Sequence, residues 1–241
     1  MKYASFALML MATPVAAQNF GGASFDVGLG AAYQPAYPGA SSDKVTPWFI
    51  FRDGSYTPGA GQDAQGFGIA PSAALVGKRK SSDSDKLAGL PNVDRAIELG
   101  ARARYGMGPV TGYATVRRGF NGHTGFTGEV GARVRTDVTD RFTLWSGAEV
   151  TYGNARYNRT YFGISDADAA AAGRDAYDAG SGFNAAALTL DMRYAVTDTT
   201  ALVGEMRYGR LIGDAKNSPV VQDTDQSSIK IGVVQRFSFG F

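Results

Sequence analysis

The chain has 241 residues, and its 24 Lys plus Arg against 22 Asp plus Glu leave a formal net charge of only +2. Because the two signs are interspersed, the sequence lacks the basic footprint of a nucleic-acid-binding protein. Cysteine is absent, which excludes disulfides, thiolate catalysis and cysteine-based metal sites. Glycine (32 residues), Phe (14) and Tyr (12) are abundant, which suits curved strands with aromatic rings at bilayer interfaces.

The N-terminal segment has the pattern of a secretory signal peptide. Lys2 precedes a largely apolar run over residues 4–11, and the small residues Val15, Ala16 and Ala17 follow. This predicts a signal peptide over 1–17, cleaved before Gln18, and a single domain over 18–241. No later stretch approaches the 18 or more apolar residues of a transmembrane helix.

The rest of the chain alternates apolar and polar residues with the period of two that is typical of β-strands. Ten segments show it, although 45–52 is apolar on both faces and 66–77 is weakly patterned. The predicted strands are 23–34, 45–52, 66–77, 97–105, 110–120, 126–135, 142–152, 186–194, 202–208 and 229–241. Most have close to the nine to eleven residues that a tilted strand needs to cross a bilayer.

The connections between these segments mostly alternate between short (106–109, 136–140, 197–199) and long (35–44, 78–94, 154–183, 211–226). This alternation is typical of outer-membrane barrels, which have short periplasmic turns and long extracellular loops. Two connections fit poorly. The outer loop 121–125 is short, and 53–65 is a long Gly/Pro-rich periplasmic turn, which we interpret as flexible. The predicted fold is an all-β, antiparallel transmembrane barrel of about ten strands, with ten to twelve as the range.

The C-terminal strand ends with Phe237, Phe239 and a terminal Phe241 on one face. Such an ending resembles that of bacterial outer-membrane barrels, where the barrel-assembly machinery reads it as a signal. The expected surroundings are therefore outer-membrane lipid and lipopolysaccharide. The alternative is a soluble sandwich that ends on an amphipathic strand.

Charged residues occupy the opposite, inward face of the predicted strands. In a ten-stranded barrel the interior is narrow, so these side chains either form a hydrogen-bonded ladder that closes the lumen or line a narrow, anion-preferring pore. Trp145 also falls on this face, as a plug residue or as a sign of a register slip. The predicted lumen residues are Glu98, Arg102, Arg104, Arg117, Glu129, Arg133, Arg135, Glu149, Asp191, Arg193, Glu205, Arg207, Lys230 and Arg236.

Catalytic and cofactor sites are weakly represented. The single histidine, His123, has no nucleophile elbow or second histidine beside it, so we interpret it as a solvent-facing or loop-packing residue rather than a catalytic base or metal ligand. We expect no cofactor. Residues 165–174 predict a short helix with Ser165 as N-cap and Gly173 as its end, either folded over the barrel mouth or in a solvated loop.

Four segments resemble the MltA-interacting protein/OmpV family: TYFGIS (160–165), GDAKNSPVV (213–221), RGFNGHTG (118–125) and the early stretch 31–49. The resemblance implies an outer-membrane barrel without a known catalytic activity. One branch of the family is a scaffold that bridges a lytic transglycosylase and a peptidoglycan synthase; others are described as porin-like proteins or adhesins. The candidate interaction residues at the rim are Asp214, Asn217, Ser218, Pro219, Tyr161 and Phe162, with Asp214 as an Asx-turn acceptor.

The sequence therefore predicts a non-enzymatic outer-membrane scaffold for peptidoglycan-remodelling enzymes, a function that rests on the resemblance alone. Binding would use the periplasmic turns, including 53–65. The alternatives are a narrow porin-like channel using the lumen arginines, a surface adhesin using the outer loops and, third, an enzyme.

Overall fold

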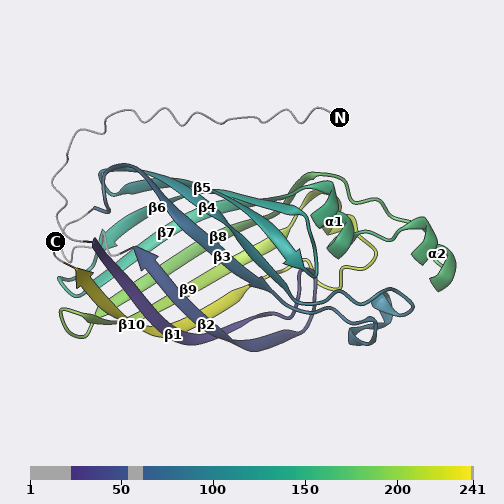
Figure 1. The fold of residues 1–241 in the computed structure, drawn as a ribbon, viewed down its shortest axis with the longest axis horizontal. Coiled ribbons are helices and arrows are strands. Elements are labelled where there is room, and N and C mark those ends of the chain that lie inside the picture. Colours follow the sequence, from purple (N-terminus) through teal and green to yellow (C-terminus); the bar gives the residue numbers. More distant parts are fainter. Residues whose placement is uncertain (1–22, 54–61, 240–241) are drawn as a thin grey trace, which may run out of the picture.

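The computed structural model describes residues 23–53 and 62–239. Within these ranges ten strands form one antiparallel sheet that curls into a barrel (Figure 1). The strands are β1 (Ala23–Pro35), β2 (Asp43–Asp53), β3 (Gly66–Val76), β4 (Ala96–Met107), β5 (Val110–Asn121), β6 (Phe126–Asp137), β7 (Phe142–Gly153), β8 (Gly182–Ala195), β9 (Thr200–Leu211) and β10 (Ser228–Phe239). The predicted all-β barrel is confirmed. The predicted signal peptide lies outside the described residues.

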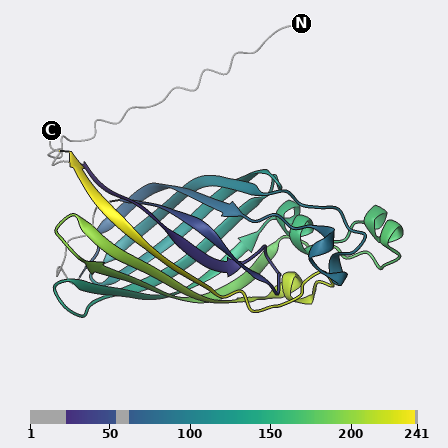
Figure 2. The same cartoon turned by 90° about the horizontal axis from the view of Figure 1, so that it is seen from below.

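The strand order is β2-β1-β10-β9-β8-β7-β6-β5-β4-β3, so strands that follow each other in sequence pair, except β2 and β3, and β1 pairs with β10. The short turns gather at one end of the barrel and the long loops at the other, as Figures 1 and 2 show. By the outer-membrane pattern, the end with short turns is periplasmic and the end with long loops is extracellular. Among the described residues, no helix has the length and apolar character that crossing a membrane requires.

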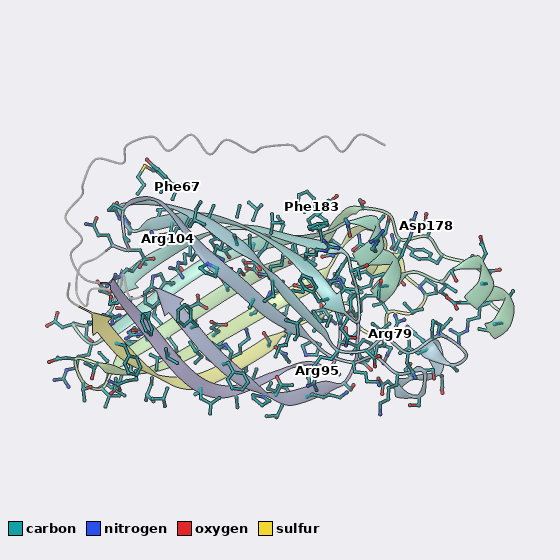
Figure 3. The ribbon with its side chains drawn as sticks, viewed as in Figure 1. Phe67, Arg79, Arg95, Arg104, Asp178 and Phe183 are labelled. Carbon is teal, nitrogen blue, oxygen red and sulfur yellow. The ribbon has the colours of Figure 1, made fainter. Side chains whose placement is uncertain are left out.

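Large apolar side chains cover the outside of the wall, which is the expected inversion of a soluble core. Leu188 on β8 and Ile231 on β10 are 63% and 66% exposed, and Phe49 on β2 is 73% exposed. These values settle the orientation of β2, which the sequence left open. Phe67 projects outward near the periplasmic end and Phe183 near the extracellular end (Figure 3), where aromatic rings suit the two bilayer interfaces.

The extracellular loops pack into a cap with two apolar clusters of its own. The cap contains three helices, α1 (Ala155–Phe162), α2 (Asp166–Ala172) and α3 (Gly213–Asn217), and two 3-10 turns, Ser81–Asp83 and Asp85–Leu87. The helix predicted over 165–174 is present as α2: the Ser165 side chain accepts from the Asp168 backbone N–H, and Gly173 ends the helix at φ +64°. Figure 1 shows α1 at the barrel mouth and α2 farther out.

We predict a depth-dependent cost for placing a charge on the lipid-facing surface. Leu188→Arg puts a cation near the middle of β8, so the free energy of unfolding should fall by about 2–4 kcal/mol. Val196→Arg, in the periplasmic turn that follows β8, is the matched control and should cost about 0–1 kcal/mol. Urea unfolding in lipid vesicles measures both. Equal costs at the two positions would contradict the assigned membrane orientation of β8.

Candidate functional site

The barrel interior is crossed by ion pairs that join strands which are not neighbours in the sheet. Glu149 on β7 accepts from Tyr113 Oη on β5 (2.8 Å) and from Arg207 Nε on β9 (2.8 Å). Because β6 and β8 separate these strands, the side chains meet inside the barrel. The structure therefore brings two predicted lumen residues, Glu149 and Arg207, into direct contact.

A second group of charges lies between β4, β5 and β6. Arg102 Nη2 is 2.5 Å from Glu129 Oε1, and its guanidinium stacks over the ring of Tyr113 at 4.5 Å. Arg117 bridges two carboxylates, with Nε 3.1 Å from Glu98 and Nη2 3.5 Å from Glu129. Opposite charges are thus interleaved rather than segregated along this wall.

Two carboxylates on the other side of the lumen each bind two cations. Glu205 is 2.5 Å from Arg52 Nη2 and 3.0 Å from Lys230 Nζ. Asp26, on β1, holds Arg193 at 2.7 Å and Arg236 at 2.9 Å. The sequence prediction did not include Arg52 and Asp26, although each lies on an inward position of its strand. Asp191 pairs in register with Glu205 and is 3.9 Å from Arg133.

Asp63, which the sequence placed in a flexible turn, binds three lumen residues at the periplasmic end of the barrel. Its carboxylate is 2.9 Å from Arg133 Nη2 and 3.5 Å from Arg135 Nη1, and it accepts from Trp145 Nε1 at 3.0 Å. Arg135 has a fully buried side chain and also binds Asp137 at 3.0 Å. The inward position of Trp145 is therefore explained by this contact, and the strand register around Trp145 is regular.

The backbone on both sides of Asp63 is also hydrogen-bonded to arginine side chains of the barrel. Arg135 Nη1 donates to the Gln62 carbonyl at 2.7 Å, and Arg104 Nη1 donates to the Ala64 carbonyl at 2.8 Å. The side chain of Gln65 donates to and accepts from the backbone of Gly108. The expectation of a flexible periplasmic turn over 53–65 is thus wrong for residues 62–65, which pack into the barrel end; residues 54–61 lie outside the described ranges.

At the extracellular mouth, His123 packs against α1. The His123 side chain is fully buried, its Nε2 is 3.2 Å from Glu98 Oε1, and its ring packs edge-on against Tyr157 at 5.0 Å and Tyr161 at 5.6 Å. The solvent-facing interpretation of His123 is wrong and the loop-packing one describes it. Burial raises the pKa of the Tyr157 and Tyr161 phenols, so both remain neutral packing groups at physiological pH.

The rim residues that carry the family resemblance divide into a buried and an exposed group. Tyr161, Phe162 and Ser218 are buried, and Ser218 Oγ donates to the Phe162 carbonyl at 2.6 Å. Asn217, Pro219 and Asp214 are exposed. Asp214 does not form the expected local Asx turn, because its carboxylate accepts from the backbone N–H of Gly180 in another loop at 3.1 Å.

The C-terminal aromatic residues lie on the outer wall as far as the structure describes them. Phe237 is exposed and stacks on Phe25 of β1 at 5.9 Å between ring centroids. Phe239 is the last residue of β10, and Phe241 lies outside the described residues. In residues 23–53 and 62–239, no three His, Asp or Glu side chains gather as a metal site.

Comparisons with known proteins agree with this architecture. The family model for MltA-interacting protein MipA matches residues 27–237. Outer membrane protein Omp26La of Vibrio anguillarum is 33% identical over 90 residues, which is 37% of this chain and 34% of that protein. The match thus spans about a third of the relative's length.

Solved outer-membrane proteins match with low sequence identity. An outer membrane channel from Pseudomonas putida F1 has a TM-score of 0.47 and 9% identity, over 93% of this chain and 100% of that one. OprG from Pseudomonas aeruginosa has a TM-score of 0.29 and 10% identity, over 90% and 97%. Because the MipA model covers most of the sequence, the family rests on that match: the chain belongs to the MltA-interacting protein MipA family and is an outer-membrane β-barrel.

Proposed function

We propose that this barrel is a non-enzymatic scaffold whose periplasmic face binds a peptidoglycan-remodelling enzyme, with a lytic transglycosylase as the first partner and a peptidoglycan synthase as the second. The observation that supports the proposal is the set of contacts that Asp63 makes with Arg133, Arg135 and Trp145 at the periplasmic end of the lumen, which we expect to close it. A lumen closed there does not favour a porin-like channel. The name of the family, which refers to interaction with MltA, supports the choice of partner.

The turn between β6 and β7 is the periplasmic surface that we assign to binding. Val138, Asp140 and Arg141 are exposed there, so the turn combines an apolar side chain with both signs of charge. The segment 62–65 is less suited to this role, because its backbone and Asp63 are committed to the barrel interior.

The closure of the lumen predicts the behaviour of an Asp63→Ala variant. Removing the carboxylate takes one partner from the buried Arg135 and one acceptor from Trp145 Nε1. The free energy of unfolding should fall by about 3 kcal/mol, and Trp145 emission, measured in a Trp48→Phe background, should shift to longer wavelength. Asp198→Ala, in the exposed β8–β9 turn, should change neither quantity. An unchanged emission in Asp63→Ala would show that Asp63 does not close the lumen.

The scaffold proposal predicts direct capture of a purified lytic transglycosylase by the folded barrel in detergent or nanodiscs. Asp140→Lys combined with Arg141→Glu should weaken capture several-fold, because rim charges set orientation and association. The matched control is the reversed extracellular pair Arg159→Glu and Asp178→Lys, whose charges lie 2.6 Å apart on the cap; it should leave capture unchanged. Absence of capture by the unmodified protein would overturn the proposal.

A further inference from the structure

The barrel wall contains one seam in the described part of the chain. Every other pair of neighbouring strands forms a hydrogen-bonded ladder, whereas β2 and β3 are the two edges of the sheet and do not pair with each other. An open strand edge is costly in the hydrocarbon layer, because its N–H and C=O groups find no water there. The seam therefore requires polar groups that reach these edges.

Both edge strands carry a proline in their interior, as is typical of strands at the edge of a sheet. Pro47 is the fifth residue of β2 and Pro71 the sixth of β3; the other prolines that the structure describes end a strand or lie in loops. Proline cannot donate to a ladder and is confined to edge strands. Each proline removes one backbone N–H donor from the middle of its strand.

The seam ends at the extracellular rim of the wall. At the extracellular end the backbones of Gly77 and Ala36 approach so closely that a Cβ on Gly77 would overlap the Ala36 carbonyl oxygen. At the periplasmic end, Gln65 binds the backbone of Gly108 in the β4–β5 turn. The unpaired edges of β2 and β3 thus end at a close backbone contact on the extracellular side.

The surfaces on either side of the seam differ in polarity. Outside, the side chains are those of the lipid-facing belt, with Phe49 and Phe51 on β2 and Ile69 and Leu75 on β3 all strongly exposed. Inside, β3 has only small side chains at its middle inward positions, namely Gly68, Ala70, Ser72 and Ala74. The Arg117 side chain of β5 reaches over them and donates to Ser72 Oγ at 3.2 Å.

The inward face of β2 supplies donors and an aromatic ring. The Trp48 ring lies on this face with the guanidinium of Arg52 at 5.8 Å and Lys230 Nζ at 5.6 Å from its centroid. Both cations have several N–H donors, and they share Glu205 as acceptor. A phosphate or carboxylate beside Trp48 would therefore meet donors on two strands.

We propose that the β2–β3 seam is a lateral portal that binds an amphiphile of the surrounding membrane. The phosphate or carboxylate head lies inside against Arg52, Lys230 and Trp48, and the acyl tail lies outside against Phe49 and Ile69. The polar linkage between head and tail hydrogen-bonds to the open strand edges. The cationic inner face, the open strand edges and the apolar outer face thus follow the order of head, linkage and tail in an amphiphile. The apolar outer face is continuous with the lipid-facing surface of the barrel. The portal is independent of the scaffold role, which uses the periplasmic turns.

Trp48 reports directly on this site, because the chain has only two tryptophans. The probe is 2-bromohexadecanoate, whose bromine lies next to the carboxylate and quenches tryptophan on contact. The refolded barrel in lipid vesicles should show saturable quenching that is absent in Trp48→Phe. Trp145 faces inward from β7, which is paired on both sides, and is the internal control.

Two sets of variants test whether the probe enters through the seam. Pro47→Val with Pro71→Val restores both donors, so the seam should close and the saturable quenching should disappear. Arg52→Gln keeps the seam and should weaken binding of the probe. Quenching that does not saturate, or that affects Trp145 equally, would overturn the proposal. The proposal would also be overturned if Trp48 were not quenched and the protein sedimented as a dimer. In that case a second copy of the chain would occupy the seam.

Discussion

A strand inside a membrane must satisfy the hydrogen bonds of both its edges, and the architecture of this protein follows from that requirement. The nine ladders between consecutive strands and between β1 and β10 meet it along most of the wall. The same pairing fixes the register, and the register sends alternate side chains to lipid and to lumen. The exception is the edge between β2 and β3, which carry Pro47 and Pro71 and do not pair with each other. This is the place where we propose that an amphiphile binds.

The second organising feature is the inversion of the usual core. Charged side chains line the narrow lumen, and their cost of desolvation is offset because most of them form ion pairs there. Glu149, Glu205 and Asp26 each bind partners from two other strands. These contacts connect strands across the lumen. Apolar packing is found mainly in the cap, around Tyr161 and Phe162, with a smaller cluster of Ile50, Val203 and Val234 inside the barrel.

The strands of the barrel wall could be predicted from the sequence, but the contacts of Asp63 and His123 at the two ends of the lumen could not. Period-two alternation and turn lengths depend on local chemistry, so strands such as β4, β7 and β8 were predictable, as was α2 from Ser165 and Gly173. The insertion of Asp63 and the burial of His123 depend on contacts with residues far away in the chain. Trp145 on a polar strand face was the signal for the first. The helix α1 was missed although Asn154, which accepts from the Tyr157 N–H at 3.0 Å, is a recognisable N-cap.

We expect the lumen to be closed to ions along its axis, because ion pairs and Asp63 occupy it. Planar-bilayer recording of the purified, refolded protein tests it most directly, with heat-modifiable gel migration to establish that the barrel is folded. We expect a folded protein that inserts without single-channel openings. Steady openings of uniform size would contradict the claim, and loss of these openings on reversal of the Arg133 and Arg135 charges would assign a conducting path to the lumen.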